Sequence, residues 1–191
     1  GYGDFKGGDT GHGGIYQHGL AAAAVCEALA VNRVLVRMVK SDRSVKFIDP
    51  SGKAVTLSDL TKLGNVLRNA SQLAINYIVY HQDAKAGGWG YTPKSAGDTS
   101  ILGWQVMALI SASSEKLATP SATWKGISNY LNTVAAGSGY AYRPAGPPKA
   151  STSAIGVLCR MYTGAQRSDP RLKTNINYLT DEGPSRGDMY Y

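Results

Sequence analysis

Apolar positions along the chain define two kinds of helical segment. Residues 98–114 and 151–164 are rich in Ala, Gly, Val, Leu and Met on nearly every helical face, a pattern typical of helices that are buried on most sides. Residues 121–136 and 169–182 carry more charge and are amphipathic, which is typical of helices that cover a core from outside. The pattern predicts a buried helix followed by an outer helix, twice over.

The N-terminal part of the chain predicts the same kind of pair with longer helices. One helix is expected over about residues 16–40 and a second over about residues 58–82. Between them, two β-leaning runs flank an Asp-Pro-Ser-Gly turn signal at residues 49–52, which indicates a β-hairpin. We interpret residues 41–57 as an insertion and expect β structure only at about residues 45–57. The prediction is therefore three helix pairs.

A repeat of about fifty residues underlies this alternation. The matching segments are the loops Gly88-Trp89-Gly90-Tyr91 and Gly139-Tyr140-Ala141-Tyr142, 51 positions apart, and the helix starts Thr99–Gly103 and Thr152–Gly156, 53 positions apart. We expect the buried helices to be capped at Asp98-Thr99 and at Ser151-Thr152, because these side-chain oxygens accept from unpaired backbone N–H groups. Repeated helix pairs stack into layered α/α arrays, so the predicted fold class is all-α.

One unit carries a recognisable motif. The segment Tyr77-Ile78-x3-Gln82-x4-Gly87-x-Trp89 resembles the QW repeat of terpenoid cyclases, and more broadly the repeat of squalene cyclases and protein prenyltransferases. The third unit is degenerate, with Ala135 in place of the Gln and Tyr140 in place of the Trp. The resemblance implies an α/α toroid whose inner helices line a cavity, and three helical hairpins would form about half of an (α/α)6 barrel.

The resemblance also implies that the motif residues are structural. In such repeats the Gln amide bonds backbone groups at a neighbouring helix end, and the Trp indole packs against the next unit. This role suits an amide, which both donates and accepts, because helix ends leave backbone groups unpaired. The expected structural residues are Tyr77, Gln82, Gly87, Trp89 and Tyr140.

The catalytic motifs of these families are missing from the sequence. There is no Asp-x-Asp-Asp cluster, with which squalene-type cyclases hold one carboxyl group protonated. Neither Cys26 nor Cys159 has the neighbours of a prenyltransferase zinc site, and no Walker, His-Glu-x-x-His or Gly-x-Ser-x-Gly motif occurs. We expect a ligand-binding, protein-binding or scaffolding domain of a larger protein. The alternative is an isoprenoid cyclase or transferase, or a carbohydrate-active α/α-barrel enzyme, with catalytic residues partly outside this chain.

The candidate chemistry that remains is near the N-terminus and along the buried helices. Asp9, His12 and His18 are candidates for acid–base catalysis, but the histidine spacing of six is not a common metal spacing, so we predict no metal and no cofactor. Within the implied toroid, the cavity-lining candidates are Tyr16, Asp98, Trp104 and Gln105.

Composition limits the partners that are expected. The 191 residues are 43% hydrophobic, enough to bury a core, and no apolar run approaches the ~20 residues of a membrane span. Residues 33–68 contain eight basic and three acidic side chains out of a total net charge of +7. We interpret this segment as a solvated helix face and do not expect nucleic-acid binding.

The repeat count predicts what the chain contacts. An open array has two apolar end faces, because each repeat buries its apolar side against a neighbour. We therefore expect residues 1–191 to be a single domain that is a fragment of a longer toroid. Its partners would be the remainder of the ring, or a second copy bound through the open ends. A hydrophobic small molecule is the expected ligand.

Overall fold

The computed structural model describes residues 14–183, which form six α-helices and two short β-hairpins. The helices are α1 (Gly14–Ser41), α2 (Leu57–His81), α3 (Thr99–Ser114), α4 (Ser121–Thr133), α5 (Ala150–Tyr162) and α6 (Pro170–Glu182). The strands are β1 (Phe47–Ile48), β2 (Ala54–Val55), β3 (Ala135–Ala136) and β4 (Gly139–Tyr140). The mostly helical class and all six helices are as predicted, with ends displaced by a few residues.

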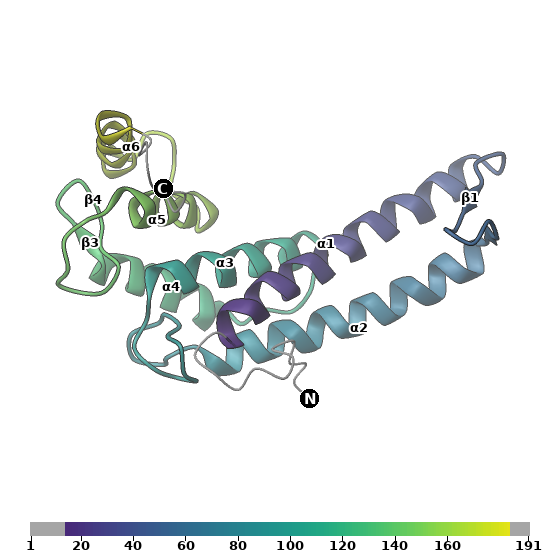
Figure 1. The fold of residues 1–191 in the computed structure, drawn as a ribbon, viewed down its shortest axis with the longest axis horizontal. Coiled ribbons are helices and arrows are strands. Elements are labelled where there is room, and N and C mark those ends of the chain that lie inside the picture. The colour runs from purple at the N-terminus through teal and green to yellow at the C-terminus, as the bar shows by residue number, and fades with distance from the viewer. Residues whose placement is uncertain (1–13, 184–191) are drawn as a thin grey trace.

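The first helix of each pair lies beside the first helix of the next. α3 packs against α1 on one side and against α5 on the other, while α2 packs on α1 and α6 packs on α5 (Figure 1). The core lies between these helices and includes Trp89, Ile101, Leu109 and Tyr130, all fully buried. The described part of the chain is thus a row of three inner helices with outer helices beside it.

Local sequence explains where several helices begin. Thr56 and Asp59 form a reciprocal capping box at the start of α2. Asp98 caps α3 by accepting from the backbone N–H groups of Ser100 and Ile101, and Asp169 caps α6 just before its first residue, a proline.

The predicted cap of α5 is wrong. Its N-cap residue is Lys149, whose side chain makes no capping bond. Ser151 and Thr152 lie inside the first turn, where the Thr152 hydroxyl donates instead to the backbone oxygen of Tyr140 at 2.6 Å.

The predicted β-hairpin is confirmed, but β structure is not confined to it. β1 pairs antiparallel with β2 as expected, and β3 pairs antiparallel with β4 in the third unit. The second hairpin lies where Ala135 replaces the glutamine of the QW motif. In the third unit the loop is closed by backbone hydrogen bonds between β3 and β4. In the second unit the corresponding position is held by the side-chain amide of Gln82.

α1 is long and apolar enough to cross a membrane by length and composition alone. That is weak evidence, because core helices and signal sequences pass the same test, and 28% of the apolar window is buried within the protein. His18, Ala22 and Cys26 of this helix are fully buried in the core.

Candidate functional site

A cavity of about 370 Å³ opens between the inner helices α1, α3 and α5. Its lining comes from the first turns of α1, one face of α3, the start of α5 and the loop before α5. The lining residues are Tyr16, Ser100, Gly103, Trp104, Met107, Tyr142, Lys149, Ser151, Thr152, Ile155 and Leu158. A volume of this size is in the range of small-molecule sites.

Most of the wall is apolar. The rings of Tyr16 and Trp104 meet edge to face with centroids 5.8 Å apart, which fixes the aromatic end of the cavity. Met107 on α3 and Ile155 and Leu158 on α5 extend the apolar wall. The cavity therefore favours a ligand with a hydrophobic body.

Polar groups gather where α5 begins. The polar residues that line the cavity there are Lys149, Ser151, Thr152, Ser100 and Tyr142. Among the described residues that line the cavity, Lys149 is the one with a full charge and none is acidic. An ammonium group beside hydroxyl groups suits a polar or anionic head on an otherwise apolar ligand.

A buried carboxylate lies behind this polar end. Asp98 is fully buried, and its Oδ1 atom accepts from the α3 backbone while its Oδ2 atom has no direct hydrogen-bond partner in the described part of the chain. The Tyr142 and Tyr91 hydroxyl groups are 2.8 Å apart. Burial, the Asp98 carboxylate and the Tyr91 hydroxyl raise the pKa of Tyr142, so its phenol is a neutral hydrogen-bond donor at physiological pH.

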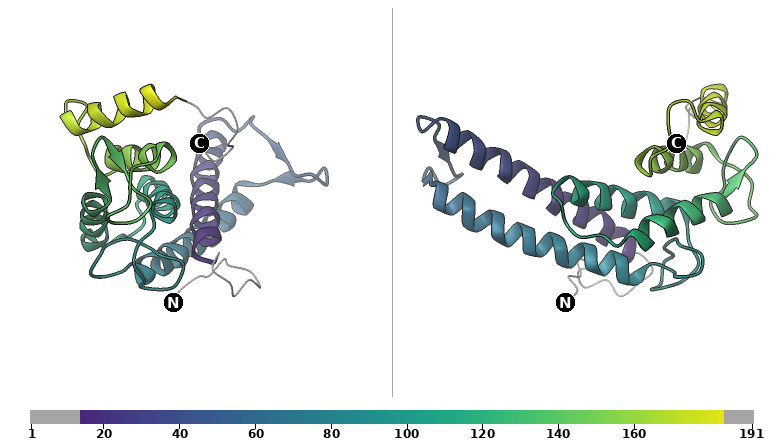
Figure 2. Two further views of the ribbon diagram at one scale, coloured as in Figure 1. Left: turned by 60° about the vertical axis from the view of Figure 1, so that its left-hand side comes forward. Right: turned by 180° about the vertical axis from the view of Figure 1, so that it is seen from behind.

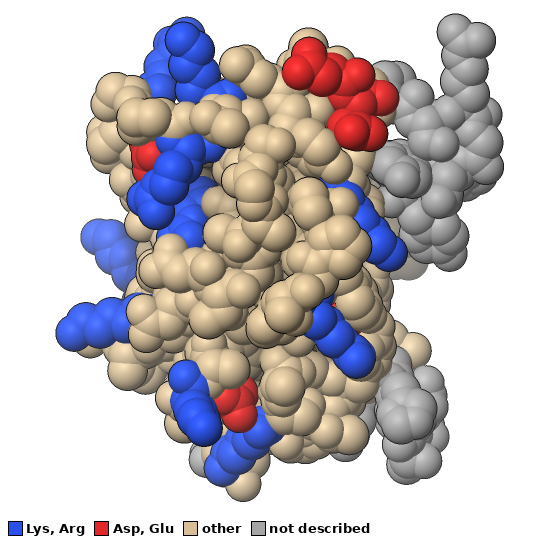
Figure 3. Space-filling model, turned by 90° about the vertical axis from the view of Figure 1, so that its left-hand side faces the viewer, with Lys and Arg blue, Asp and Glu red and all other residues tan. Residues whose placement is uncertain are grey.

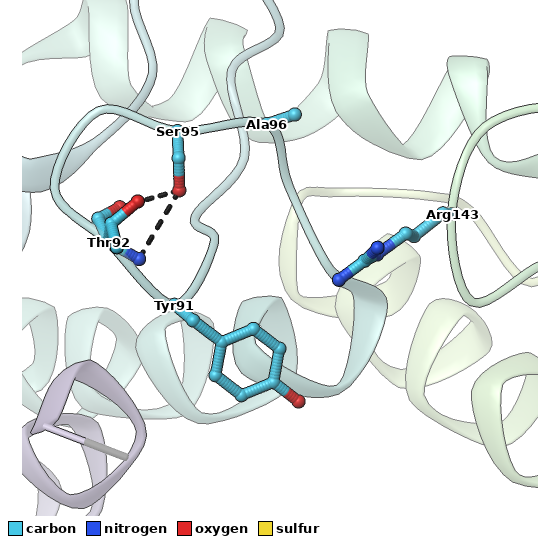
Figure 4. Close-up of a pocket in the computed structure, with 5 residues that line it drawn as sticks. All are labelled: Tyr91, Thr92, Ser95, Ala96 and Arg143. Atoms are coloured by element: carbon cyan, nitrogen blue, oxygen red, sulfur yellow. Dashed lines mark hydrogen bonds between the residues drawn. The ribbon is translucent and has the colours of Figure 1, made fainter. Parts of the chain in front are cut away.

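A second, more open pocket of about 560 Å³ lies on the other side of this tyrosine pair. It is lined by Tyr91, Thr92, Ser95, Ala96 and Arg143, with Arg143 opposite the loop that carries the others (Figure 4). The Ser95 hydroxyl is held by the backbone of Thr92, to which it donates at 2.6 Å. This pocket is more open and has less apolar wall, and we regard the cavity between α1, α3 and α5 as the candidate site.

Two of the four predicted cavity residues line the cavity and two do not. Tyr16 and Trp104 form its aromatic end. Asp98 is the buried cap of α3, and the buried Gln105 donates from Nε2 to the backbone oxygen of Ile15 at 2.9 Å, which links α3 to α1. Gln105 therefore belongs to the helix interface.

The motif residues have the geometry of structural staples. The Gln82 amide nitrogen donates to the backbone oxygens of Gly87 at 2.8 Å and Thr123 at 3.0 Å, and so joins the end of α2 to the start of α4. The indole of Trp89 is fully buried, and its Nε1 atom donates to the Ile78 backbone oxygen at 2.8 Å. Gly87 has φ +83°, and a Cβ there would lie 2.1 Å from the Gly126 backbone oxygen.

The two remaining motif tyrosines are buried as well. Tyr77 lies between the rings of His18 and His81, at centroid distances of 4.2 and 3.8 Å. The Tyr140 ring packs on Gly156, and its hydroxyl accepts from Arg160 at 3.2 Å.

The N-terminal candidates form no site in the described residues. Asp9 and His12 lie outside the described residues. His18 is fully buried, and its Nε2 atom contacts the Ala74 backbone oxygen at 3.0 Å, which makes that nitrogen a donor and not a metal ligand. Within residues 14–183 no group of three or more His, Cys, Asp or Glu side chains could hold a metal ion.

The sequence did not reveal the residues at the polar end of the cavity. Tyr142 was visible only as the repeat partner of Tyr91, 51 positions earlier, and that offset was the one signal that could have singled out the pair. Lys149 occupies the position of Asp98 in the next unit, again 51 residues on, so a cation stands where the second unit has its capping carboxylate.

Comparison of the whole chain with known protein families, curated proteins and solved structures finds no match.

Proposed function

We propose that the chain is part of a toroid-repeat domain, resembling terpenoid cyclases and prenyltransferases but without their catalytic motifs, that binds a small hydrophobic molecule. The observation that carries the proposal is the cavity between α1, α3 and α5, with an apolar wall and one cationic end. The ligand would place its apolar body against Trp104 and Leu158 and a polar head near Lys149.

The repeat geometry supports the toroid part of the proposal. The backbone N–H of Asp98 donates to the Trp89 oxygen at 2.9 Å, and that of Lys149 donates to the Tyr140 oxygen at 3.2 Å. Both donors and both acceptors are 51 residues apart. The two units therefore close their loops with the same bond, as a repeat architecture requires.

Dye displacement tests the ligand-binding proposal. The probe is N-phenyl-naphthylamine, a neutral apolar dye, displaced by long-chain alcohols and by the matching carboxylates. Leu158, 37% exposed, lines the cavity. Leu158→Arg puts a charge where the apolar dye would lie and should weaken dye binding by about tenfold or more, since the bound dye would cover a charge without a partner. Met161→Arg is the matched control, because Met161 is exposed on the same helix and does not line the cavity.

Three outcomes of the displacement assay decide the proposal. Binding that Leu158→Arg abolishes and Met161→Arg preserves would support the cavity as the site. A preference for the carboxylates that Lys149→Gln removes would support the cationic end. Equal binding by all the variants would contradict the proposal.

The Asp98 carboxylate behind Tyr142 favours a second candidate. An isoprenoid cyclase or transferase, or a carbohydrate-active α/α-barrel enzyme, needs an acid near its substrate, and Tyr142 borders the cavity. The test is turnover of a polyprenyl diphosphate by the protein and by Asp98→Asn, in which the amide oxygen can still cap α3. If the wild-type protein turns over the substrate and Asp98→Asn does not, the result would favour the enzyme. If the wild-type protein binds the dye but shows no turnover, the result would favour the binding domain.

A further inference from the structure

The α1–α2 hairpin extends well beyond the other helices and ends at the β1–β2 turn (Figures 1 and 2). α1 has 28 residues and α2 has 25, so each is roughly 40 Å long at about 1.5 Å per residue. In the second half of α1, Arg33 pairs with Glu115 at the end of α3 at 2.8 Å. The turns of α1 beyond Arg33 and the facing turns of α2 pack mainly on each other.

This projecting part exposes large aliphatic side chains. Val34 and Met38 lie on one face of α1 with exposed fractions of 48% and 43%. Ile48 in β1 is 68% exposed at the end of the hairpin. Single exposed apolar residues are ordinary, but several on one projecting element mark an interaction surface.

The same segment carries an excess of positive charge. Its exposed basic residues that form no ion pair with a described residue are Arg37, Lys40, Arg43, Lys46, Lys53 and Lys62. The three acidic residues are engaged locally: Asp42 accepts from Ser44, Asp49 accepts from Ser51, and Asp59 caps α2. The segment therefore presents a net positive field and exposed apolar groups together.

The opposite end of the protein is also basic, but less densely. Residues 121–183 contain seven basic and three acidic side chains, against eight and three in the shorter segment 33–68. Figure 3 shows this end, where several Lys and Arg side chains lie near one another along one edge and acidic groups lie on the same face. The hairpin therefore has the higher density of positive charge along the chain.

We propose that the end of the α1–α2 hairpin docks on an anionic lipid bilayer. The basic side chains would lie at the headgroup phosphates, while Ile48 and Met38 enter the boundary between headgroups and acyl chains. A second copy of the chain fits this surface poorly, because its hairpin has the same charge. A nucleic acid would leave the aliphatic groups without an apolar partner.

Docking is favoured over insertion of α1 across the bilayer. Spanning would remove His18, Ala22 and Cys26 of α1 from the core, where all three are fully buried. The hairpin end, in contrast, reaches a surface without disturbing that core. This proposal does not rest on the ligand-binding function, and either can fail without the other.

Co-sedimentation with vesicles tests the docking proposal. The vesicles are phosphatidylcholine alone, or phosphatidylcholine mixed equally with phosphatidylglycerol, at low and physiological salt. The wild-type protein should bind the anionic vesicles and not the neutral ones. Replacing Arg37, Lys40, Arg43 and Lys46 by glutamine should lower the partition coefficient by about tenfold or more, because each basic residue near the surface contributes to binding.

Two further variants separate charge from apolar contact. Ile48→Ser with Met38→Ser should keep binding at low salt and lose it at physiological salt, where screening weakens the electrostatic part. Lys125→Gln with Lys173→Gln removes two exposed cations from α4 and α6 and should change nothing. Circular dichroism confirms that each variant is folded.

Four results would overturn the proposal. These are no vesicle binding by the wild type, equal binding to neutral vesicles, or equal loss in the Lys125 and Lys173 control. The fourth is salt-sensitive binding to a DNA duplex that the glutamine variant loses and the serine variant keeps, with no preference for anionic lipid. That result would assign the surface to nucleic acid.

Discussion

At the residue scale, the contacts of Trp89 and Gln82 carry the most definite energetic expectations. Trp89→Ala removes a fully buried indole together with its bond to the Ile78 backbone oxygen. We expect a loss of about 3–5 kcal/mol in the free energy of unfolding, the range for truncation of a large buried aromatic. Urea unfolding followed by circular dichroism measures it. Trp124→Ala, at a half-buried indole, should cost less, and an unchanged midpoint for Trp89→Ala would contradict the staple role.

The amide of Gln82 is expected to matter as a donor and not as packing. Gln82→Glu keeps the shape but removes both bonds from Nε2, to the Gly87 and Thr123 backbone oxygens. We expect a loss of about 1–3 kcal/mol, because two backbone acceptors lose their donor. Gln166→Glu, on an exposed glutamine with one local bond, should change stability by at most about 0.5 kcal/mol. Equal effects of the two substitutions would show that the joint between α2 and α4 does not depend on the amide.

At the scale of elements, the alternation of apolar and amphipathic segments was enough to predict six helices and the first β-hairpin. The second hairpin could not be predicted, because Ala135, Ala136 and Gly139 have no preference for strands. Their pairing comes from loop closure between α4 and α5, which is a tertiary effect. The start of α5 was misplaced for a related reason: Thr152 bonds a preceding loop and not its own helix end.

The inner helices α3 and α5 approach closely at Gly103, and this contact predicts a coupling. A Cβ at Gly103 would lie 2.8 Å from Cγ2 of Ile155 on α5. Gly103→Ala should therefore destabilise the protein by about 1–3 kcal/mol through overpacking. In an Ile155→Ala background the same change should cost clearly less, because the opposing atoms are gone. Additive effects in this double-mutant cycle, measured by urea unfolding, would mean that the two helices do not meet there.

At the scale of the whole molecule, the sequence could predict the order of the helices but not the site between them. Tyr16, Trp104 and Leu158 come from three helix pairs and meet only when α1, α3 and α5 lie side by side. Two of these were singled out from the implied toroid, because they are aromatic residues on inner helices. Lys149 was missed, because a cation at a helix start runs against the usual preference for acidic and hydroxyl caps.

The buried thiol and phenol groups predict how global stability changes in alkaline solution. Burial raises the pKa of Cys159 from its ordinary 9.0 to about 12, and burial raises that of Tyr130 from 10.0 to about 12. Between these values the native state holds more protons than the unfolded state. Stability is therefore constant with respect to these groups below about pH 9 and falls as pH rises toward 12, by up to about 1.4 kcal/mol per pH unit for each group.

Urea unfolding at a series of pH values checks this expectation. Cys159→Ala should flatten the part of the fall in unfolding free energy that begins near pH 9. Tyr130→Phe should flatten the part that begins near pH 10. Cys26, whose thiol is also buried and has a raised pKa, should contribute at the lower end. Stability that rises between pH 9 and pH 11 would contradict the sign derived from burial.

Two bonds between the second and third units run from the start of α3 to the loop that follows β4. At the start of α3, the Thr99 backbone N–H donates to the Tyr142 oxygen at 3.0 Å, and its hydroxyl donates to the Ala141 oxygen at 2.7 Å. The first turn of one inner helix is thus completed by the loop of the unit that follows it. The start of α3 therefore depends on a loop that is synthesised later, so a nascent chain would hold α3 loosely until residues 141–142 had arrived.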